Sequence, residues 1–150
     1  MRAFILSLIL AGTAVTAAAQ SAVELWQEDR SRIFDAAEID LADFVWVARP
    51  VVVFAQTPND PQFGQQMDLL TARIDELALR DVIVITDTAP DTPGALRKAL
   101  RPRGFMLAII AKDGRTALRK PAPWDVREIT RSIDKMPLRQ QEIRDRRSVE

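Results

Sequence analysis

The 150-residue sequence contains no cysteine, no histidine and no tyrosine. Without a thiol, the single chain offers neither thiol redox chemistry nor a cysteine nucleophile. Without an imidazole, it lacks the base of a Ser-His-Asp triad and the most common ligand for zinc or copper. These absences exclude several classes of enzyme. They also mean that the core must stabilise the fold without disulfide bonds.

The sequence also lacks an excess of charge of either sign, because 21 Lys and Arg residues balance 21 Asp and Glu residues. Basic and acidic residues alternate along most of the chain, so no basic stretch that could follow a phosphate backbone is evident. We therefore expect no nucleic-acid partner. The acidic residues Asp87, Asp91 and Asp113 match no EF-hand loop, and we expect neither a metal site nor a cofactor.

Residues 1–19 have the pattern of a cleaved secretory signal. Arg2 gives a positive start, an apolar run follows, and three alanines precede Gln20, where cleavage is expected. A membrane anchor is the alternative, but the most apolar part, residues 4–10, is much shorter than the roughly 20 residues of a membrane span. We expect an exported chain, periplasmic or secreted, with no stable membrane anchor after cleavage.

The centre of the sequence predicts a strand, a helix and a second strand. Residues 50–55 and 81–86 are short apolar runs rich in β-branched residues, which is typical of strands buried on both faces. Asp60 before Pro61 favours a helix start, and the helix is expected to close near Arg80. The two strands should pair in parallel through a right-handed crossover. The apolar face of the predicted helix consists of Phe63, Met67, Leu70, Ile74 and Leu77.

The flanking segments complete one small domain, residues 41–142. Residues 20–40 predict a loosely helical, solvated lead-in, and Trp46 is expected in the core. A short helix should run from Thr92-Pro93 to Arg101-Pro102, followed by a strand over residues 105–111, a tight turn and an edge strand over residues 115–119. The last helix should open at Pro123 and end at Pro137, leaving residues 143–150 as a flexible tail.

This order of elements resembles the core of the thioredoxin-like fold. Residues 55–60 fall where thioredoxins place their Cys-x-x-Cys motif, and Met106 stands where they place a cis-proline. Both redox elements are missing, which argues against an oxidoreductase. The resemblance implies an α/β fold with a mixed four-stranded sheet, in the order β-α-β-α-β-β-α, flanked by helices.

Over residues 41–142 the chain is similar to a family of secreted thioredoxin-like domains of unknown function, the DUF4174 type. That family also occurs in the C-terminal parts of some animal extracellular-matrix proteins. Phe63 departs from the tyrosine expected there, and the resemblance implies no established activity. The motifs that carry this resemblance include Gln65-Gln66 and Ile133. We assign structural roles to the other motif residues, which are Trp46, Arg49, Pro50, Arg80, Asp81, Lys112, Asp113, Gly114, Asp134, Met136, Pro137 and Arg139.

One candidate binding site lies at the end of the first strand. Ligands of α/β sheets tend to bind beyond the strand ends, and a helix start attracts anions. The polar residues predicted there are Thr57, Asn59, Asp60, Gln65 and Gln66. We prefer the alternative in which Asp60 only caps the helix and the other residues solvate a loop.

A second cluster is predicted at the end of the last helix. The break at Met136-Pro137 would let Arg139 fold back toward the sheet and meet a carboxylate such as Asp134, with Arg49 nearby. A bidentate guanidinium–carboxylate pair would fix this turn. We prefer this structural role to a binding role.

Three hypotheses for function follow. The preferred one is a non-catalytic binding or interaction module with an unknown protein or small-molecule partner. The second is an enzyme with Asp60 as base and Thr57 or Asn59 as positioning groups, which requires a deep pocket around Asp60. The third is a structural component of a cell-envelope assembly.

Overall fold

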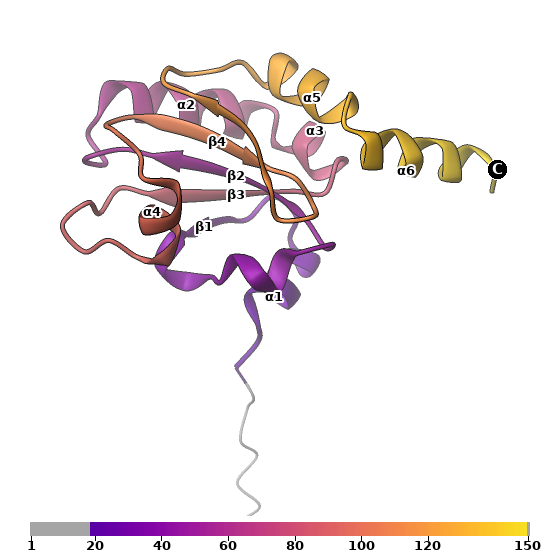
Figure 1. The fold of residues 1–150 in the computed structure, drawn as a ribbon, viewed down its shortest axis with the longest axis horizontal. Helices are drawn as coiled ribbons and strands as arrows, with labels where there is room; N and C mark the ends of the chain where they lie inside the picture. Colours follow the sequence, from indigo (N-terminus) through magenta and orange to yellow (C-terminus); the bar gives the residue numbers. More distant parts are fainter. Residues whose placement is uncertain (1–18, 150) are drawn as a thin grey trace, which may run out of the picture.

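The computed structural model describes residues 19–149 (Figure 1). The predicted signal sequence therefore lies outside the described residues, except for Ala19. Within residues 19–149, no helix is both long enough and apolar enough to cross a bilayer.

A five-stranded mixed sheet forms the centre of the molecule, with the strand order β1-β3-β2-β4-β5. Strands β1, β3 and β2 are parallel to one another. Strand β4 runs antiparallel to β2, and β5 runs antiparallel to β4. The predicted pairing of the two central strands is confirmed, with Val51 opposite Val84. The strands are β1 (Ile33–Asp35), β2 (Arg49–Phe54), β3 (Val82–Asp87), β4 (Met106–Ile110) and β5 (Thr116–Lys120).

Helices cover both faces of the sheet. Helices α2, α3 and α5 lie on one face and α1 and α4 on the other, while α6 extends away from the body (Figure 1). The α-helices are α1 (Ala22–Glu28), α2 (Pro61–Ala72), α3 (Ile74–Ala78), α4 (Ala95–Leu100), α5 (Val126–Asp134) and α6 (Pro137–Arg147), and the two 3-10 helices are η1 (Ala36–Glu38) and η2 (Leu41–Phe44).

The alternation of side chains along β2 creates two apolar cores. Val51 and Val53 pack with Leu70 and Ile129 under α2, α3 and α5. Val52 and Phe54 point the other way, into a cluster covered by α1, η2 and α4. Every residue of β2 is buried, as the continuous apolar run predicts for a central strand.

The N-terminal segment supplies a strand that the sequence analysis did not predict. Strand β1 pairs in parallel with β3, so the sheet has five strands rather than four. Phe34 is buried, and the buried Trp26 meets Phe44 edge to face with ring centroids 6.3 Å apart. Because β1 has only three residues, it is too short to show a period of two.

Proline positions account for the other differences in helix bounds. Pro93 and Pro123 precede α4 and α5 instead of opening them, and the caps are Gly94 and Asp125. Pro137 does not merely end a helix, because it is also the first residue of α6. The long helix predicted after Asp60 is broken at Arg73 (φ −134°, ψ 34°), which separates α2 from α3.

The burial of Phe34 gives a test of the fifth strand. We expect Phe34→Ala to lower the free energy of unfolding by about 3–5 kcal/mol, because truncating a buried phenylalanine loses transfer free energy and leaves a cavity. Urea unfolding of residues 20–150, followed by circular dichroism, measures this change. The control Leu79→Ala, at a side chain 65% exposed, should change stability by less than about 0.5 kcal/mol. Equal stability of Phe34→Ala and the parent would contradict a structural role for β1.

Candidate functional site

The polar residues predicted at the carboxyl end of β2 do not share a cavity. Asp60 caps α2 as expected, since its Oδ1 accepts a hydrogen bond from the Gln62 N–H at 2.8 Å. Thr57, Asn59 and Gln65 are exposed. Gln66 is buried, and its side-chain amide bonds to the backbone N–H and C=O of Trp124 at 2.7 and 3.0 Å. It therefore fixes the segment before α5. None of these residues lines any of four cavities found among residues 19–149.

An ion pair that the sequence analysis missed fills the same end of the sheet. The guanidinium of Arg97 donates to Asp87 Oδ1 at 2.8 and 3.0 Å. It also donates to the backbone oxygens of Ala55 and Asp87, at 3.0 and 2.9 Å. Both side chains are buried. The backbone oxygens of Ala55 and Asp87, at the ends of β2 and β3, are thus satisfied by a side chain, beside the place that the sequence analysis considered as a candidate binding site.

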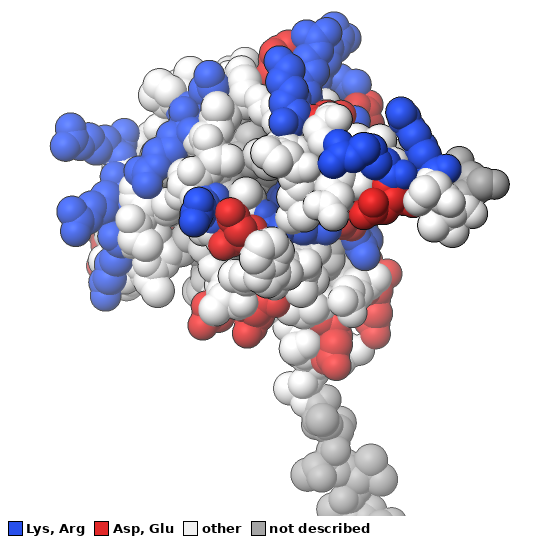
Figure 2. All heavy atoms as spheres, turned by 45° about the vertical axis from the view of Figure 1, so that its right-hand side comes forward, with Lys and Arg blue, Asp and Glu red and all other residues white. Residues whose placement is uncertain are grey.

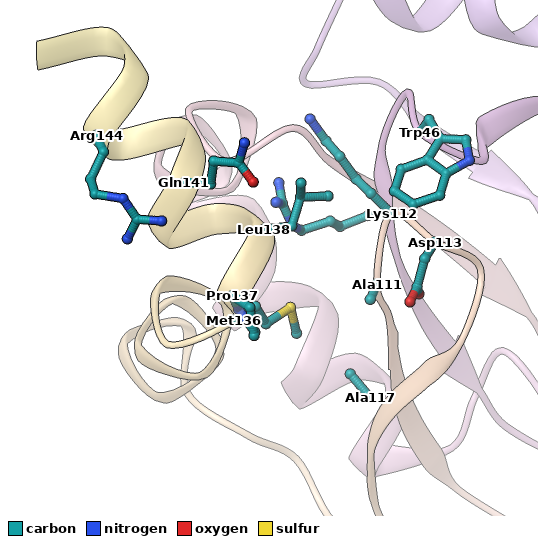
Figure 3. Close-up of a pocket in the computed structure, with 11 residues that line it drawn as sticks. Trp46, Ala111, Lys112, Asp113, Ala117, Met136, Pro137, Leu138, Gln141 and Arg144 are labelled. Atoms are coloured by element: carbon teal, nitrogen blue, oxygen red, sulfur yellow. The ribbon is translucent and has the colours of Figure 1, made fainter. Parts of the chain in front are cut away.

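Most of the family motifs quoted above meet instead at the amino ends of β2 and β3. Because β4 runs antiparallel to β2, the turn at residues 112–114 returns to the start of β2. Asp81 immediately precedes β3, and the junction of α5 and α6 lies beside the same edge (Figures 1 and 3). The structure therefore brings together Trp46, Arg49, Arg80, Asp81, Lys112, Asp113, Asp134, Met136, Pro137 and Arg139 through direct contacts or as the lining of one cavity.

Arg49 lies at the centre of this cluster and is only 1% exposed. It donates to the Arg80 carbonyl oxygen and to Glu142 Oε1, both at 2.9 Å. Its buried Nε–H has no acceptor among the described residues. Lys112 Nζ joins the cluster through Glu142 Oε1 at 2.9 Å and Asp81 Oδ2 at 2.8 Å.

The predicted meeting of Arg139 with Asp134 is present, but the bidentate partner is a different arginine. Arg139 Nε lies 3.4 Å from Asp134 Oδ1, and its Nη1 lies 3.2 Å from Glu142. Arg80 makes the bidentate pair with Asp134, at 2.9 and 2.8 Å. We name the whole set the charge network, which consists of Arg30, Arg49, Arg80, Asp81, Lys112, Asp134, Arg139 and Glu142.

The charge network lowers the pKa of its three carboxyl groups. Burial alone would raise the pKa of Glu142, but hydrogen bonds from Lys112 and Arg49 outweigh it and hold that pKa below the ordinary 4.5. Burial likewise opposes hydrogen bonds from Lys112 and Arg30 at Asp81, whose pKa falls below 3.8. At Asp134, burial is outweighed by hydrogen bonding to Arg80, and the pKa falls in the same direction.

A cavity of about 560 Å³ opens beside the charge network, between the β4–β5 hairpin and α6. We name it the hairpin cavity. Figure 3 shows side chains of α6 on one side of it and Trp46 with the hairpin on the other. Its walls are mostly apolar, and across residues 19–149 no group of acidic residues is placed to hold a metal ion. The lining consists of Trp46, Arg49, Ala111, Lys112, Asp113, Ala117, Met136, Pro137, Leu138, Gln141 and Arg144.

Trp46 lies at the rim of this cavity, so its predicted place in the core is wrong. Its side chain is 65% exposed, and its backbone has φ 65°, which is unusual for a residue other than glycine. The Trp46 N–H donates to the Lys112 carbonyl oxygen at 2.6 Å, which ties the turn before β2 to the hairpin. The buried Phe44 ends η2, and the chain turns between it and Trp46, so the two aromatic side chains have different environments.

The lowered pKa values predict acid sensitivity. A carboxyl group whose pKa is lower in the folded state stabilises the fold above its unfolded pKa, and this contribution is lost as the pH falls through the folded pKa. Stability should therefore decline progressively below the ordinary values of 4.5 for Glu142 and 3.8 for Asp81 and Asp134. Urea unfolding at pH 7, 5, 4 and 3 measures the decline. A free energy of unfolding that stays constant over this range would contradict it.

Glu142→Gln should lower stability at pH 7 by about 1–3 kcal/mol, because buried Arg49 loses its carboxylate, and should flatten the pH dependence. The control Glu128→Gln removes an exposed carboxylate from its pair with Arg131 and should change stability by less than about 0.5 kcal/mol. Equal losses in the two variants would show that the charge network has no special role.

The fold is similar to that of a solved thioredoxin-like protein. Thioredoxin peroxidase I of Plasmodium yoelii superposes with a TM-score of 0.50 at 17% sequence identity, covering 69% of this chain and 81% of that chain. At this identity the likeness shows the fold alone, and the predicted thioredoxin-like α/β class is confirmed. The comparison with curated protein sequences gave no match.

The sequence itself places the chain in a family. The model of a domain of unknown function (DUF4174) matches residues 40–142, close to the limits expected from the sequence. This match covers more than half of the chain and nearly the whole sheet with its helices. The chain therefore belongs to the DUF4174 family.

Proposed function

We propose that this chain is an exported, non-catalytic binding module whose ligand site is the hairpin cavity. Export to the periplasm or beyond is supported by the signal pattern of residues 1–19 and by a family resemblance that extends to secreted proteins. A non-catalytic role is supported by the absence of cysteine and histidine from the sequence. The observation that carries the proposal is a cavity of about 560 Å³ with the exposed Trp46 at its rim.

The lining of the hairpin cavity favours a small amphipathic anion, with an apolar body and one acidic group. The volume is within the usual range of roughly 300–1,000 Å³ for small-molecule sites. Ala111, Met136 and Leu138 offer apolar contacts for the body of the ligand. Among the charged lining residues, Arg49 and Lys112 are already paired with Glu142 and Asp81, so Arg144 is the cation left to attract a negative group.

Arg144 is the lining residue best suited to hold that acidic group. It forms no salt bridge with any residue in the described part of the chain, and it projects from α6 beside Gln141 (Figure 3). Arg49 also lines the cavity, but its guanidinium is already bonded to Glu142 and to the Arg80 carbonyl oxygen.

Binding of 8-anilinonaphthalene-1-sulfonate tests this proposal, since the dye joins an apolar ring system to one sulfonate. We expect saturable binding at one site, with enhanced dye fluorescence. Trp46→Ala should weaken binding about tenfold through lost ring contact, and Arg144→Glu by about tenfold or more through charge reversal. Fluorescence titration at pH 7 gives the dissociation constants.

The matched control is Arg146→Glu, which makes the same charge change on α6 at a residue outside the cavity lining. It should bind the dye as tightly as the parent. Urea unfolding of all three variants checks that the fold is retained. Binding that is unsaturable, or that falls equally in Arg144→Glu and Arg146→Glu, would overturn the assignment of the site.

The non-catalytic part of the proposal has its own test. Purified residues 20–150 should neither reduce insulin with dithiothreitol nor consume hydrogen peroxide above the uncatalysed rate, because the chain has no thiol to exchange. Turnover that persists through repurification and is lost in Asp60→Ala would instead support the carboxylate enzyme considered in the sequence analysis.

A further inference from the structure

A second cavity, of about 300 Å³, lies at the opposite end of the sheet from the hairpin cavity. It is formed where α4 ends, β4 begins and β5 ends. Its charged lining residues are Arg101, Arg103, Arg119 and Lys120, with no Asp or Glu among them. We name it the basic cavity. Phe105, Met106 and Pro121 supply its apolar surface.

The four cations of the basic cavity are not neutralised within residues 19–149. None of them forms a salt bridge there, whereas their neighbours in sequence, Arg97 and Arg115, pair with Asp87 and Asp113. Four like charges around one small space repel one another, and an anion that enters relieves this repulsion. The basic cavity therefore attracts a ligand with more than one negative charge.

Two contacts hold the cationic groups in place before any ligand binds. Arg119 Nη1 donates to the carbonyl oxygen of Leu100, the last residue of α4, at 2.7 Å. Lys120 Nζ lies 4.5 Å from the centroid of the Trp124 ring. Fixed donors lose less side-chain entropy on binding, so the site is partly preorganised.

The charges of this domain are separated in space, although they balance in sequence. Between residues 97 and 120 the only acidic residue is Asp113, whereas residues 20–44 are strongly acidic. On the face shown in Figure 2, most Lys and Arg side chains gather on the upper and left parts, and Asp and Glu side chains line the lower edge. The separation of charge on the folded surface thus follows a separation along the chain, which the statement that charges alternate along most of the sequence overlooked.

We infer that the basic cavity binds a phosphate group of a phosphorylated ligand. Three arginines offer planar guanidinium groups whose paired N–H donors match phosphate oxygens, and a phosphate carries more charge than a single carboxylate. The apolar surface of Phe105 and Met106 lies beside the charges and would contact the remainder of the ligand. The phosphate could belong to a soluble phosphorylated compound or to a lipid headgroup. This inference does not depend on the hairpin cavity.

Binding of pyrophosphate, measured by isothermal titration calorimetry on residues 20–150, tests the soluble source. Sedimentation with vesicles that contain phosphatidic acid, whose phosphomonoester can carry two negative charges, compared with vesicles of phosphatidylcholine alone, tests the lipid source. Either form of binding should weaken as salt rises, since phosphate contacts are electrostatic.

The test variants are Arg101→Gly and Arg103→Gln. Arg101 has a left-handed backbone (φ 48°, ψ 58°), which glycine adopts freely, so Arg101→Gly removes the side chain without straining the fold. Each variant should weaken binding about tenfold or more. The control Arg115→Gln removes the same charge at a side chain 89% exposed and outside the cavity, and it should bind as the parent does.

The outcomes separate cleanly. Loss of pyrophosphate binding in the two test variants, with retention in Arg115→Gln, supports a soluble ligand. The same pattern with phosphatidic acid vesicles, and not with pyrophosphate, supports a lipid headgroup. Absence of both kinds of binding in the parent, or an equal loss in all three variants, overturns the inference. Arg101→Gly and Arg103→Gln should bind the fluorescent dye at the hairpin cavity as the parent does, so a failure here is distinguishable from a failure at the hairpin cavity.

Discussion

The burial of β2 is the constraint on which the rest of this structure depends. As the central strand, it exchanges hydrogen bonds with β3 on one side and β4 on the other, and it exposes no side chain. Val51 and Val53 require one helical layer and Val52 and Phe54 require the other. Neither layer is optional in a chain that has no disulfide to replace lost burial. Polar chemistry is consequently confined to the two ends of the strand.

Each end of β2 is occupied by a buried arginine, with opposite consequences. At the carboxyl end, Arg97 satisfies the backbone oxygens of Ala55 and Asp87 and pairs with the Asp87 carboxylate. At the amino end, Arg49 enters a network that still leaves an open cavity beside it. A buried charge is tolerated only when it is paired and hydrogen-bonded, so both arginines limit which partners the sheet can accept. One end of β2 is therefore closed by an ion pair, and the other borders an open cavity.

The sequence was sufficient to predict those strands and helix starts that depend on the local pattern of apolar and capping residues. Residues 50–55 and 81–86 form the central parallel pair, and the Asp60 cap starts α2 as expected. The sequence was insufficient to predict β1, because three residues are too few to show a periodic pattern. It was also insufficient for Trp46, because a tryptophan gives no indication of a left-handed backbone. Apart from the two local pairs of Arg139, the charge network joins positions 31 to 93 residues apart, and Glu142 lies in a polar stretch that resembles an ordinary solvated tail. Long-range pairs of this kind become visible only once the topology has brought the strand ends together.

The contact between Arg49 and Glu142 also bears on the order in which the chain can reach its native state. The guanidinium belongs to the first long strand to emerge, whereas its carboxylate stands on the last helix. A nascent or translocating chain that has not yet delivered α6 can assemble the sheet, yet it would leave a cation in the interior without a counter-charge. Completion of the domain is therefore coupled to the synthesis of its C-terminal helix. Truncation before this helix would remove residues that the folded domain requires.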